Sequence, residues 1–284
     1  MTLRLPPLQL LHLLLPAVLA GAVLGACGAP NPAPLRLGTT YTVQQSGALA
    51  VLESLWRPPP PLATVIGPSG QILRAAASGD LAVVITHAPS LEQRLLVQPG
   101  HALLACALVA SRFAVVGPPA DPAHVAAATS AADAFRRIAR AGGPFVSRGD
   151  SSGTHTKEVA LWRAAGVTPG ASSWYVESGA DQATTLHLAD ERAAYALADL
   201  PTLARVSDPG LRVLFAADTA LTNPYTLYVV RQSGAGSDSA ARAFAAWAVR
   251  AGRAAILGLR LRDGTPAFVP RAGAGDDCAT VTSR

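Results

Sequence analysis

The segment SRGDSSGTHTKE, residues 147–158, carries the residue types in this chain that are best suited to chemistry. Its G-x-S-x-G spacing at residues 149–153 is that of a nucleophile elbow, in which Ser151 would be a catalytic serine. The same residues also fit a loop of hydroxyl side chains between a strand and a helix, where N–H groups and hydroxyls can hold an anion. A hydrolase and an anion binder are therefore the two hypotheses.

The hydrolase hypothesis requires a histidine base and a carboxylate after the serine, in the order Ser, Asp/Glu, His for the α/β-hydrolase fold. His155 lies only four residues after Ser151, and His187 lies in a predicted helix rather than in a late loop. Asp181 precedes His187 at too short a spacing. GDSSG resembles the GDSGG of chymotrypsin-like proteases, but the β-barrel pattern is absent. We keep a secreted serine hydrolase using Ser151 as the alternative.

Two other loops have the composition expected of an anion site. GTTYT at residues 38–42 and GPSGQ at residues 67–71 each follow a predicted strand and precede a predicted helix. In an open parallel sheet such strand ends face the ligand crevice, and helix N-termini there favour negative charge. Arg148 adds a guanidinium that can contact two oxygens at once. Three such loops with one arginine predict an oxyanion site.

Other catalytic patterns are missing from the sequence. It contains no H-E-x-x-H, no C-x-x-C and no G-x-x-x-x-G-K-[ST]. The six histidines are scattered singly, and His87 alone stands at a strand end near the predicted crevice. We expect no cofactor, no metal and no enzymatic activity.

The N-terminal 26 residues have the features of a secretory signal, with an apolar stretch that ends in Leu24-Gly-Ala directly before Cys27. This ending resembles a bacterial lipoprotein box, which predicts lipidation of Cys27; a plain secreted protein is the alternative. Residues 27–34 would form a flexible tether. The expected location is extracytoplasmic, on a lipid anchor, in the periplasm or on the outer face of the cell membrane.

Composition excludes some partners and leaves others open. The net charge of +5 is spread evenly, and no basic run with interleaved aromatic residues suggests nucleic-acid binding. The length suits one large domain or two lobes. In an exported protein Cys106 and Cys278 could form a disulfide; a buried thiol at Cys106 and a free Cys278 are the alternative.

Short apolar strands alternate with amphipathic helices along the chain, which predicts an α/β fold with a mostly parallel sheet and helices on both faces. The expected strands are 35–37, 63–66, 81–86, 112–116, 145–147, 193–197, 211–215 and 226–230. The expected helices are 48–56, 70–77, 90–96, 131–141, 154–165 and 238–251, with another short helix after the last.

With these motifs, most of the chain after the tether resembles the periplasmic tungstate-binding proteins of ABC importers, the TupA family. FVSRGDSSGTHTKEVALW, residues 145–162, is the most specific match, close to the family's FVSRGD-x-SGTH. The other similar segments are GTTYTVQQSG (38–47), GPSGQIL (67–73), VVITHAPS (83–90), FAVVGPPADP (113–122), LADERAAYALAD (188–199), LTNPYTLYVV (221–230) and FAAWAVRAGRAAILG (244–258).

The resemblance implies a two-lobed periplasmic-binding-protein fold with the oxyanion in the cleft between the lobes. Lobe 1 would comprise residues 35–116 and 223–284, and lobe 2 residues 117–222, with crossings near Gly117 and Asn223. The partners would be an ABC permease in the membrane and its separate ATPase, and we expect a monomer. The residues that would hold the anion are Thr39, Thr40, Ser69, Arg148, Ser151, Ser152, Thr154 and Tyr225.

The identity of the anion stays open at this point. Tyr41, Thr42 and Gln45 depart from the family's first loop, and residues 178–186 lack its glycine-rich form. Tungstate or molybdate would need donors only, whereas monohydrogen phosphate also carries an O–H that needs an acceptor. Phosphate-binding proteins of the same fold use R-x-D-x-S-G-T, which Arg148, Asp150 and residues 152–154 fit. Asp150 could accept that proton or merely orient Arg148, and the longer match favours tungstate.

Overall fold

The computed structural model describes residues 33–282, apart from 171, 207–209, 233–237 and 276–277, and also Thr2. Residues 32–284 form one compact unit. Cys27, its proposed lipidation and nearly all of the signal and tether lie outside the described residues. Among the described residues no helix is both long and apolar enough to cross a membrane.

A parallel sheet opens the fold. Strand β1 (Leu35–Thr40) pairs in parallel with β2 (Leu62–Gly67) on one side and with β3 (Val83–Thr86) on the other. Helices α2 (Ala48–Leu55) and α3 (Ser69–Ala77) connect these strands. Because parallel strands end at the same edge, Thr40, Gly67 and Thr86 lie near one another, as the crevice hypothesis requires.

Two long strands extend this sheet in the antiparallel sense. β9 (Thr222–Val230) pairs with β3 and with β4 (Ala102–Gly117), and both pairings are antiparallel. The sequence predicted only the last part of β4, at residues 112–116. The preceding LLACALV run belongs to the same strand. The chain leaves the first sheet along β4 and returns to it along β9, so these two strands run in opposite directions.

The far end of β4 organises a second group of strands. β7 (Ala196–Asp199) and β8 (Arg212–Phe215) pair with residues 113–117 of β4, both antiparallel. β5 (Phe145–Ser147) pairs in parallel with β6 (Tyr175–Glu177) and, through a single bridge from Phe145, with Tyr195 beside β7. The expected parallel pairing is therefore present in both groups, and β4 with β9 joins them.

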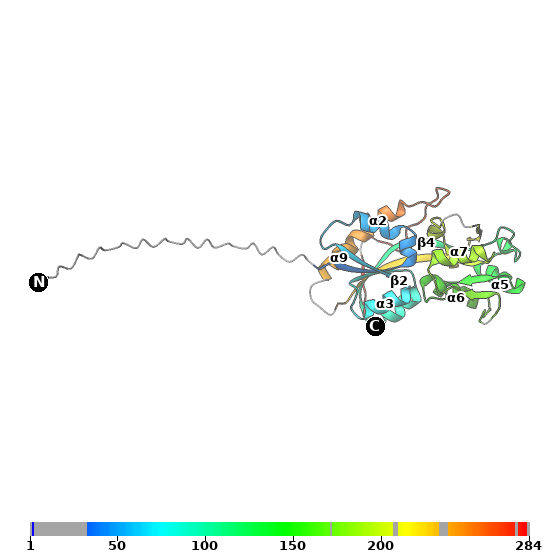
Figure 1. Ribbon diagram of the computed structural model, residues 1–284, viewed down its shortest axis with the longest axis horizontal. Helices are drawn as coiled ribbons and strands as arrows, with labels where there is room; N and C mark the ends of the chain where they lie inside the picture. Colours follow the sequence, from blue (N-terminus) through cyan, green and yellow to red (C-terminus); the bar gives the residue numbers. More distant parts are fainter. Residues whose placement is uncertain are drawn as a thin grey trace. The chain divides into compact units, whose positions relative to one another are not determined.

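Helices cover the two groups of strands separately. In Figure 1, α2, α3 and α9 (Asp238–Trp247) lie around one end of β4, and α5 (Ala131–Ala141), α6 (Gly153–Ala164) and α7 (Gln182–Glu191) lie around the other. The remaining helical segments are α1 (Tyr41–Gln45), α4 (Pro89–Glu92), α8 (Leu200–Leu203), α10 (Arg253–Leu257) and the short turns at 93–97, 125–127, 219–221 and 248–252.

The hydrophobic cores follow the same division. The clusters around Leu37 and Leu73 draw on residues up to Val109 and again from Tyr225 onward. The clusters around Phe135 and Leu186 draw on residues from Phe113 to Leu221. We call the two groups the first and second lobe. The cores change over between Val109 and Phe113 on β4, and between Leu221, directly before β9, and Tyr225 on β9.

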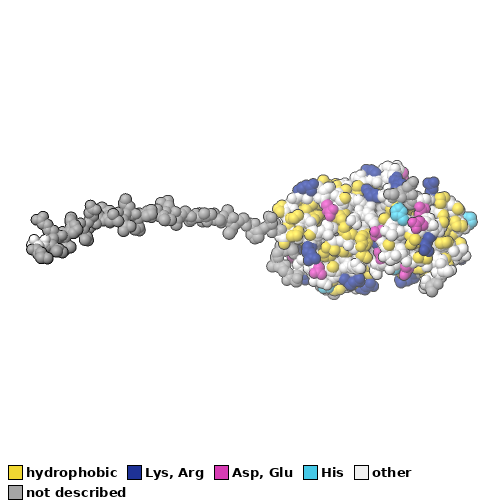
Figure 2. Space-filling model, in the orientation of Figure 1, with side chains coloured by type: hydrophobic (Ala, Val, Ile, Leu, Met, Phe, Trp, Pro, Cys, Tyr) yellow, Lys and Arg dark blue, Asp and Glu magenta, His cyan; other side chains and the backbone are white. Residues whose placement is uncertain are grey.

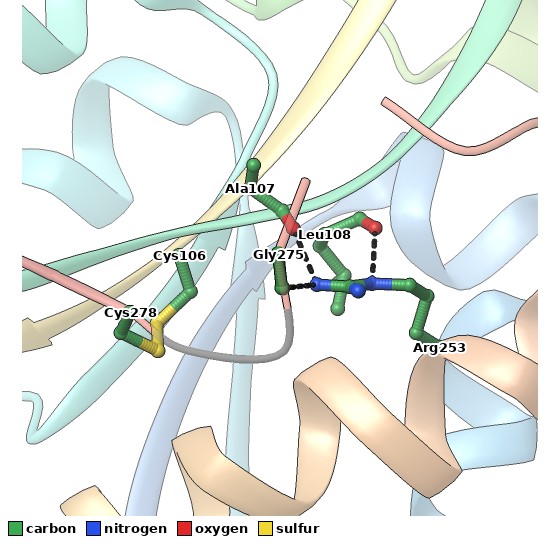
Figure 3. Close-up of a disulfide and its surroundings, with 6 residues drawn as sticks. All are labelled: Cys106, Ala107, Leu108, Arg253, Gly275 and Cys278. Carbon is green, nitrogen blue, oxygen red and sulfur yellow. Dashed lines mark hydrogen bonds between the residues drawn. A yellow bond between two sulfur atoms is a disulfide. The ribbon is translucent and has the colours of Figure 1, made fainter. Parts of the chain in front are cut away.

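A disulfide joins the end of the chain to the first lobe. Cys106 on β4 is bonded to Cys278, next to the short strand β10 (Ala279–Thr280), which pairs with β4. Figure 3 shows the guanidinium of Arg253 beside it, donating to the carbonyls of Ala107, Leu108 and Gly275.

Charged side chains are dispersed over the surface. On the face in Figure 2 the basic and acidic side chains stand in small groups separated by neutral ones, consistent with the even spread of charge in the sequence.

Candidate functional site

The three predicted loops meet where the two lobes touch. The backbone N–H of Gly153, at the start of α6, donates to Ser69 Oγ at the start of α3, at 3.1 Å. The N–H of Gly70 donates to the carbonyl of Ser151 at 3.3 Å. The N-termini of one helix from each lobe therefore face each other, and the hydroxyl loops of the sequence are brought together.

Arg148 is the only positively charged side chain among those predicted for the site, and it is almost fully buried, with 2% of its surface exposed. Its Nε donates to the carbonyl of Ala180 at 3.2 Å, and its Nη1 lies 3.4 Å from Thr42 Oγ1 of the first lobe. Burial lowers the pKa of Arg148, and the adjacent Asp150 carboxylate opposes that shift. Because an arginine keeps its proton even so, the site contains a fixed cation.

Asp150 uses both carboxylate oxygens within its own loop. Oδ2 pairs with Arg148 Nη2, and Oδ1 accepts the backbone N–H of Ser152 at 3.1 Å. The Asp150 side chain is 7% exposed. Of the two roles that the sequence left open, this geometry matches a residue that orients Arg148 and shapes the loop.

Ser152 and Thr154 stand at the start of α6 and are both buried. Ser152 is the N-cap of the helix, since its Oγ accepts the N–H of His155 at 3.1 Å. Thr154 Oγ1 is buried and has no hydrogen-bond partner among the described residues. A buried hydroxyl without a partner is costly, so this atom marks a position where a ligand oxygen would be stabilised.

Thr39 and Thr40 end β1 and are both buried. Thr39 Oγ1 donates to the carbonyl of Ile85 on β3 at 3.1 Å. Thr40 Oγ1 accepts the N–H of Val43 at 3.3 Å and caps α1. Both hydroxyls thus also have local structural roles, and their part in anion binding stays a prediction.

Tyr225 contacts His87 with its ring, whereas its hydroxyl is bonded elsewhere. The ring stacks on His87 with centroids 5.2 Å apart. The hydroxyl points into a buried polar cluster at the strands that join the lobes, within 3.1–3.4 Å of Ser111, Asp199 and Asn223. In this structure the tyrosine supports His87, and its role as a direct ligand residue stays a prediction.

Several residues near the site were not among the predicted ligand residues. Thr42 contacts Arg148, and Gln45 Oε1 accepts the N–H of Ala183 across the lobes at 3.2 Å. His87 lies against the start of α6, and its Nδ1 is 3.0 Å from Asn223 Oδ1. The signal for His87 was its place directly after β3, at the same sheet edge as the other loops, whereas a pairing 136 residues away with Asn223 leaves no local pattern.

Ser151 has the backbone conformation that the hydrolase hypothesis requires, but no histidine among the described residues is arranged as its base. Ser151 is exposed and has a φ of 59°, in the left-handed region, as in a nucleophile elbow. The Ser151 N–H, however, donates to His155 Nδ1 at 3.3 Å. A triad histidine needs that nitrogen to donate to a carboxylate, so His155 is not arranged as a catalytic base.

The described residues also offer no metal centre. No group of three or more His, Cys, Asp or Glu side chains in the described part of the chain lies close enough together to bind an ion. The chemistry of the donor set is that of hydroxyls, N–H groups and one guanidinium, which suits an anion.

Comparison with known proteins supports this assignment. A family profile described as "PBP superfamily domain" matches residues 28–251. The tungstate-binding protein TupA of Peptoclostridium acidaminophilum is 32% identical over 72% of this chain and 73% of its own. A Haloferax volcanii protein, provisionally named an ABC transporter anion-binding protein, is 38% identical over 67% of this chain, which spans only 58% of that relative.

Solved structures give the same picture. The tungstate ABC transporter structure from Geobacter sulfurreducens has 34% identity and a TM-score of 0.69 and covers 80% of this chain and 98% of that one. The tungstate-binding protein TupA from Desulfovibrio alaskensis G20 has 28% identity and a TM-score of 0.69, covering 86% and 100%.

Proposed function

The chain belongs to the PBP superfamily and, within it, to the family of the TupA tungstate-binding proteins, and on this premise we propose that it captures tungstate for an ABC importer. It would act as a binding protein without catalytic chemistry of its own. Its partners would be the oxyanion, a permease in the membrane and that permease's separate ATPase.

The buried Arg148–Asp150 pair is the observation that carries this proposal. A guanidinium that is 2% exposed at the contact between two lobes, aimed at a threonine of the opposite lobe, is a costly arrangement for a merely structural arginine. Around a bound oxyanion the cost is offset, because charge-assisted hydrogen bonds are the strong ones.

The role of Asp150 supports tungstate rather than phosphate as the ligand. Tungstate near neutral pH has only acceptor oxygens, whereas monohydrogen phosphate also needs an acceptor for its O–H. Both oxygens of Asp150 are already engaged by Arg148 and Ser152. Asp150 is thus held in place as the residue that orients Arg148, and this role, together with the similarity to tungstate-binding proteins, supports tungstate, with molybdate as the nearest chemical analogue.

Binding would close the two lobes around the anion. The sequence placed the lobe boundaries at 35–116 and 223–284 for one lobe and 117–222 for the other. We propose the same division with the crossing on β4 at residues 110–112, because Phe113 and Val115 already pack in the second lobe's core. Contacts such as Ser69 with Gly153 and Gln45 with Ala183 join the lobes in the arrangement described here and would be formed on closure. The closed form would then be what the permease recognises.

The location follows from the function and from the start of the chain. A binding protein of an importer acts outside the cytoplasm. Lipidation of Cys27 would anchor the protein to the membrane there, and residues 27–34 would form the tether. The protein would act as a monomer.

A thermal-shift panel tests the proposed function. The chain without its signal segment is heated with tungstate, molybdate, phosphate or sulfate, each at saturation. A ligand at about 100 times its Kd adds roughly 2.7 kcal/mol to the folded state, which is a visible shift. We expect shifts with tungstate and molybdate only. A shift with phosphate alone would make phosphate, rather than tungstate, the ligand. If no anion gave a shift, the hydrolase hypothesis would return and an assay with ester substrates would follow.

Arg148→Ala should weaken tungstate binding by at least about 100-fold, which is ~2.8 kcal/mol, since it removes the cation and leaves the Asp150 carboxylate unpaired beside a dianion. The matched control is Arg163→Ala. Arg163 is an exposed arginine near the end of α6, the helix that begins at the site. Calorimetric titration measures both. Unchanged affinity in Arg148→Ala would disprove the site assignment.

A further inference from the structure

His87 is buried at the contact between the lobes and has a free ring nitrogen. It follows β3, has 2% of its surface exposed, and lies against Gly153 of the second lobe. A Cβ atom on Gly153 would come within 2.6 Å of both Cε1 and Nδ1 of the imidazole. Since Nε2 is bonded to Cε1, this nitrogen also lies at the start of α6.

The hydrogen-bond network fixes the tautomer of the ring. Asn223 Nδ2 is 3.0 Å from Asp199 Oδ1, and a carboxylate oxygen can only accept, so the amide nitrogen faces Asp199. Asn223 Oδ1 then faces His87 Nδ1 at 3.0 Å and can only accept. His87 Nδ1 must therefore carry a proton, and in the neutral ring Nε2 is a bare acceptor.

Nothing in the described part of the chain uses that acceptor. His87 Nε2 and Thr154 Oγ1 are both buried side-chain atoms without a hydrogen-bond partner there, and both belong to residues at the start of α6 or against it. Buried polar atoms are normally satisfied. The two unsatisfied atoms, a hydroxyl and an imidazole nitrogen, mark a place for a ligand at the start of the helix that follows the Arg148 loop.

We propose that His87 is a further ligand-binding residue and that the oxyanion is bound together with one proton, held between His87 Nε2 and an oxygen of the anion. This proposal rests on the proposed function, because it concerns the same site. An oxyanion without hydrogens offers only acceptors, so it cannot contact a bare Nε2. The contact forms once Nε2 is protonated, which gives an imidazolium that donates to Asn223 with one nitrogen and to the anion with the other.

The surroundings of His87 keep its ring neutral until an anion binds. Burial first, and then the nearby Arg148 cation, lower the pKa of His87 to about 4, while Asp150 opposes the shift. The ring is therefore neutral at pH 7 before the anion binds. Two further acids lie nearby, Asp199 beyond Asn223 and Glu92, which accepts the Ala88 N–H, and burial raises the pKa of both. The Tyr225 ring covers one face of the imidazole. A dianion bound beside the ring would raise the pKa of His87 and draw in the proton.

The proton has two possible sources, and they can be told apart. Tungstate carries no proton near neutral pH, so the proton must come from the solvent and the affinity should rise as the pH falls. Monohydrogen phosphate carries its own proton, so it could occupy the same contact without net uptake. For tungstate, one linked proton changes the affinity by at most tenfold per pH unit.

Calorimetric titration with tungstate in two buffers of different ionisation enthalpy measures the number of protons taken up. At pH 7 we expect close to one for the wild-type chain without its signal segment. His87→Gln keeps an N–H donor but cannot take a proton, so its uptake should be near zero and its affinity should no longer depend on pH. The control His187→Gln, an exposed histidine on α7, should behave as wild type.

Each outcome decides the matter. Tungstate binding without proton uptake, or uptake that persists in His87→Gln, would overturn the proposal and leave the proposed function standing. A failure of wild type to bind tungstate would overturn both. Should His87→Gln not fold, ¹⁵N NMR of the wild-type imidazole replaces it: Nε2 must gain a proton when tungstate is added, and a ring that stays neutral would refute the proposal.

Discussion

At the scale of single residues, Glu158 shows how a buried acid supports the site without touching it. Its carboxylate accepts from Ser147 Oγ, Trp162 Nε1 and Tyr175 Oη at 2.8–3.1 Å. Ser147 Oγ in turn accepts the N–H of Gly149 at 3.2 Å, which places the backbone on either side of Arg148. Glu158 thus orders the loop that carries the arginine.

The buried Glu158 should make stability depend on pH. Burial raises the pKa of Glu158 from 4.5 to about 7, so the folded state binds a proton that the unfolded state has already lost. Its contribution to stability is therefore fully present below about pH 4.5 and falls as the pH rises to about 7, by about 3 kcal/mol. Glu158→Gln mimics the protonated glutamate, because the amide nitrogen of the glutamine can donate to Ser147 Oγ.

Urea unfolding at pH 5 and pH 8 measures this effect. We expect Glu158→Gln to match wild type at pH 5 and to be more stable than wild type at pH 8. Glu191→Gln, an exposed carboxyl at the end of α7, serves as the control and should follow wild type throughout. A variant that loses stability equally at both pH values would show that Glu158 is charged in the folded protein.

At the scale of elements, the approach of α6 to the turn after β3 depends on a glycine. A Cβ on Gly153 would lie 2.6 Å from the His87 ring and 2.8 Å from the His87 carbonyl. The ring cannot move aside easily, because Asn223 holds its Nδ1 and Tyr225 stacks on its face. An added methyl group must therefore push the helix, and with it the second lobe, away from the first.

Gly153→Ala should reduce tungstate affinity by about 5- to 150-fold, the effect of the 1–3 kcal/mol that overpacking costs. Gly67→Ala at the end of β2 is the control, because its Cβ would meet no atom closer than 3.5 Å. Titration of both variants, with thermal unfolding as a check of folding, makes the comparison. Equal affinity in the two variants would mean that α6 does not need this close approach.

The sequence predicted local elements well and long-range arrangements poorly. The bounds of α5 and β5 agree with the expectation, because an amphipathic period, a Ser130 cap and a compact apolar run are all local signals. The length of β4 was missed, since its two halves are buried by different lobes and show no single periodicity. The roles of Asp150 and Tyr225 could not be predicted either, because each depends on where one oxygen points.

At the scale of the whole molecule, β4 contributes to the cores of both lobes and pairs with β9, which begins directly after Leu221 of the second core, so the lobes are joined by two adjacent antiparallel strands. A buried network of Ser111, Asp199, Asn223 and Tyr225 lies on this junction. It connects to His87 and so to the site. Movement of one lobe against the other would therefore shift the residues proposed to contact the oxyanion.

The disulfide joins β4 to the C-terminal segment next to β10, at one edge of the sheet, and its effect should be on stability alone. Cys106 belongs to the core of that lobe, and its bond to Cys278 closes a loop between residues 172 positions apart. Cross-links across long loops contribute ~2–5 kcal/mol, largely by restricting the unfolded chain. Cys278→Ser should lower the free energy of unfolding by that amount, measured with urea, and leave the Kd for tungstate unchanged, because the site residues lie on other elements. Reductant should destabilise wild type in the same way and leave Cys278→Ser unaffected. A loss of tungstate affinity in Cys278→Ser would instead show that the C-terminal segment positions the site through β4.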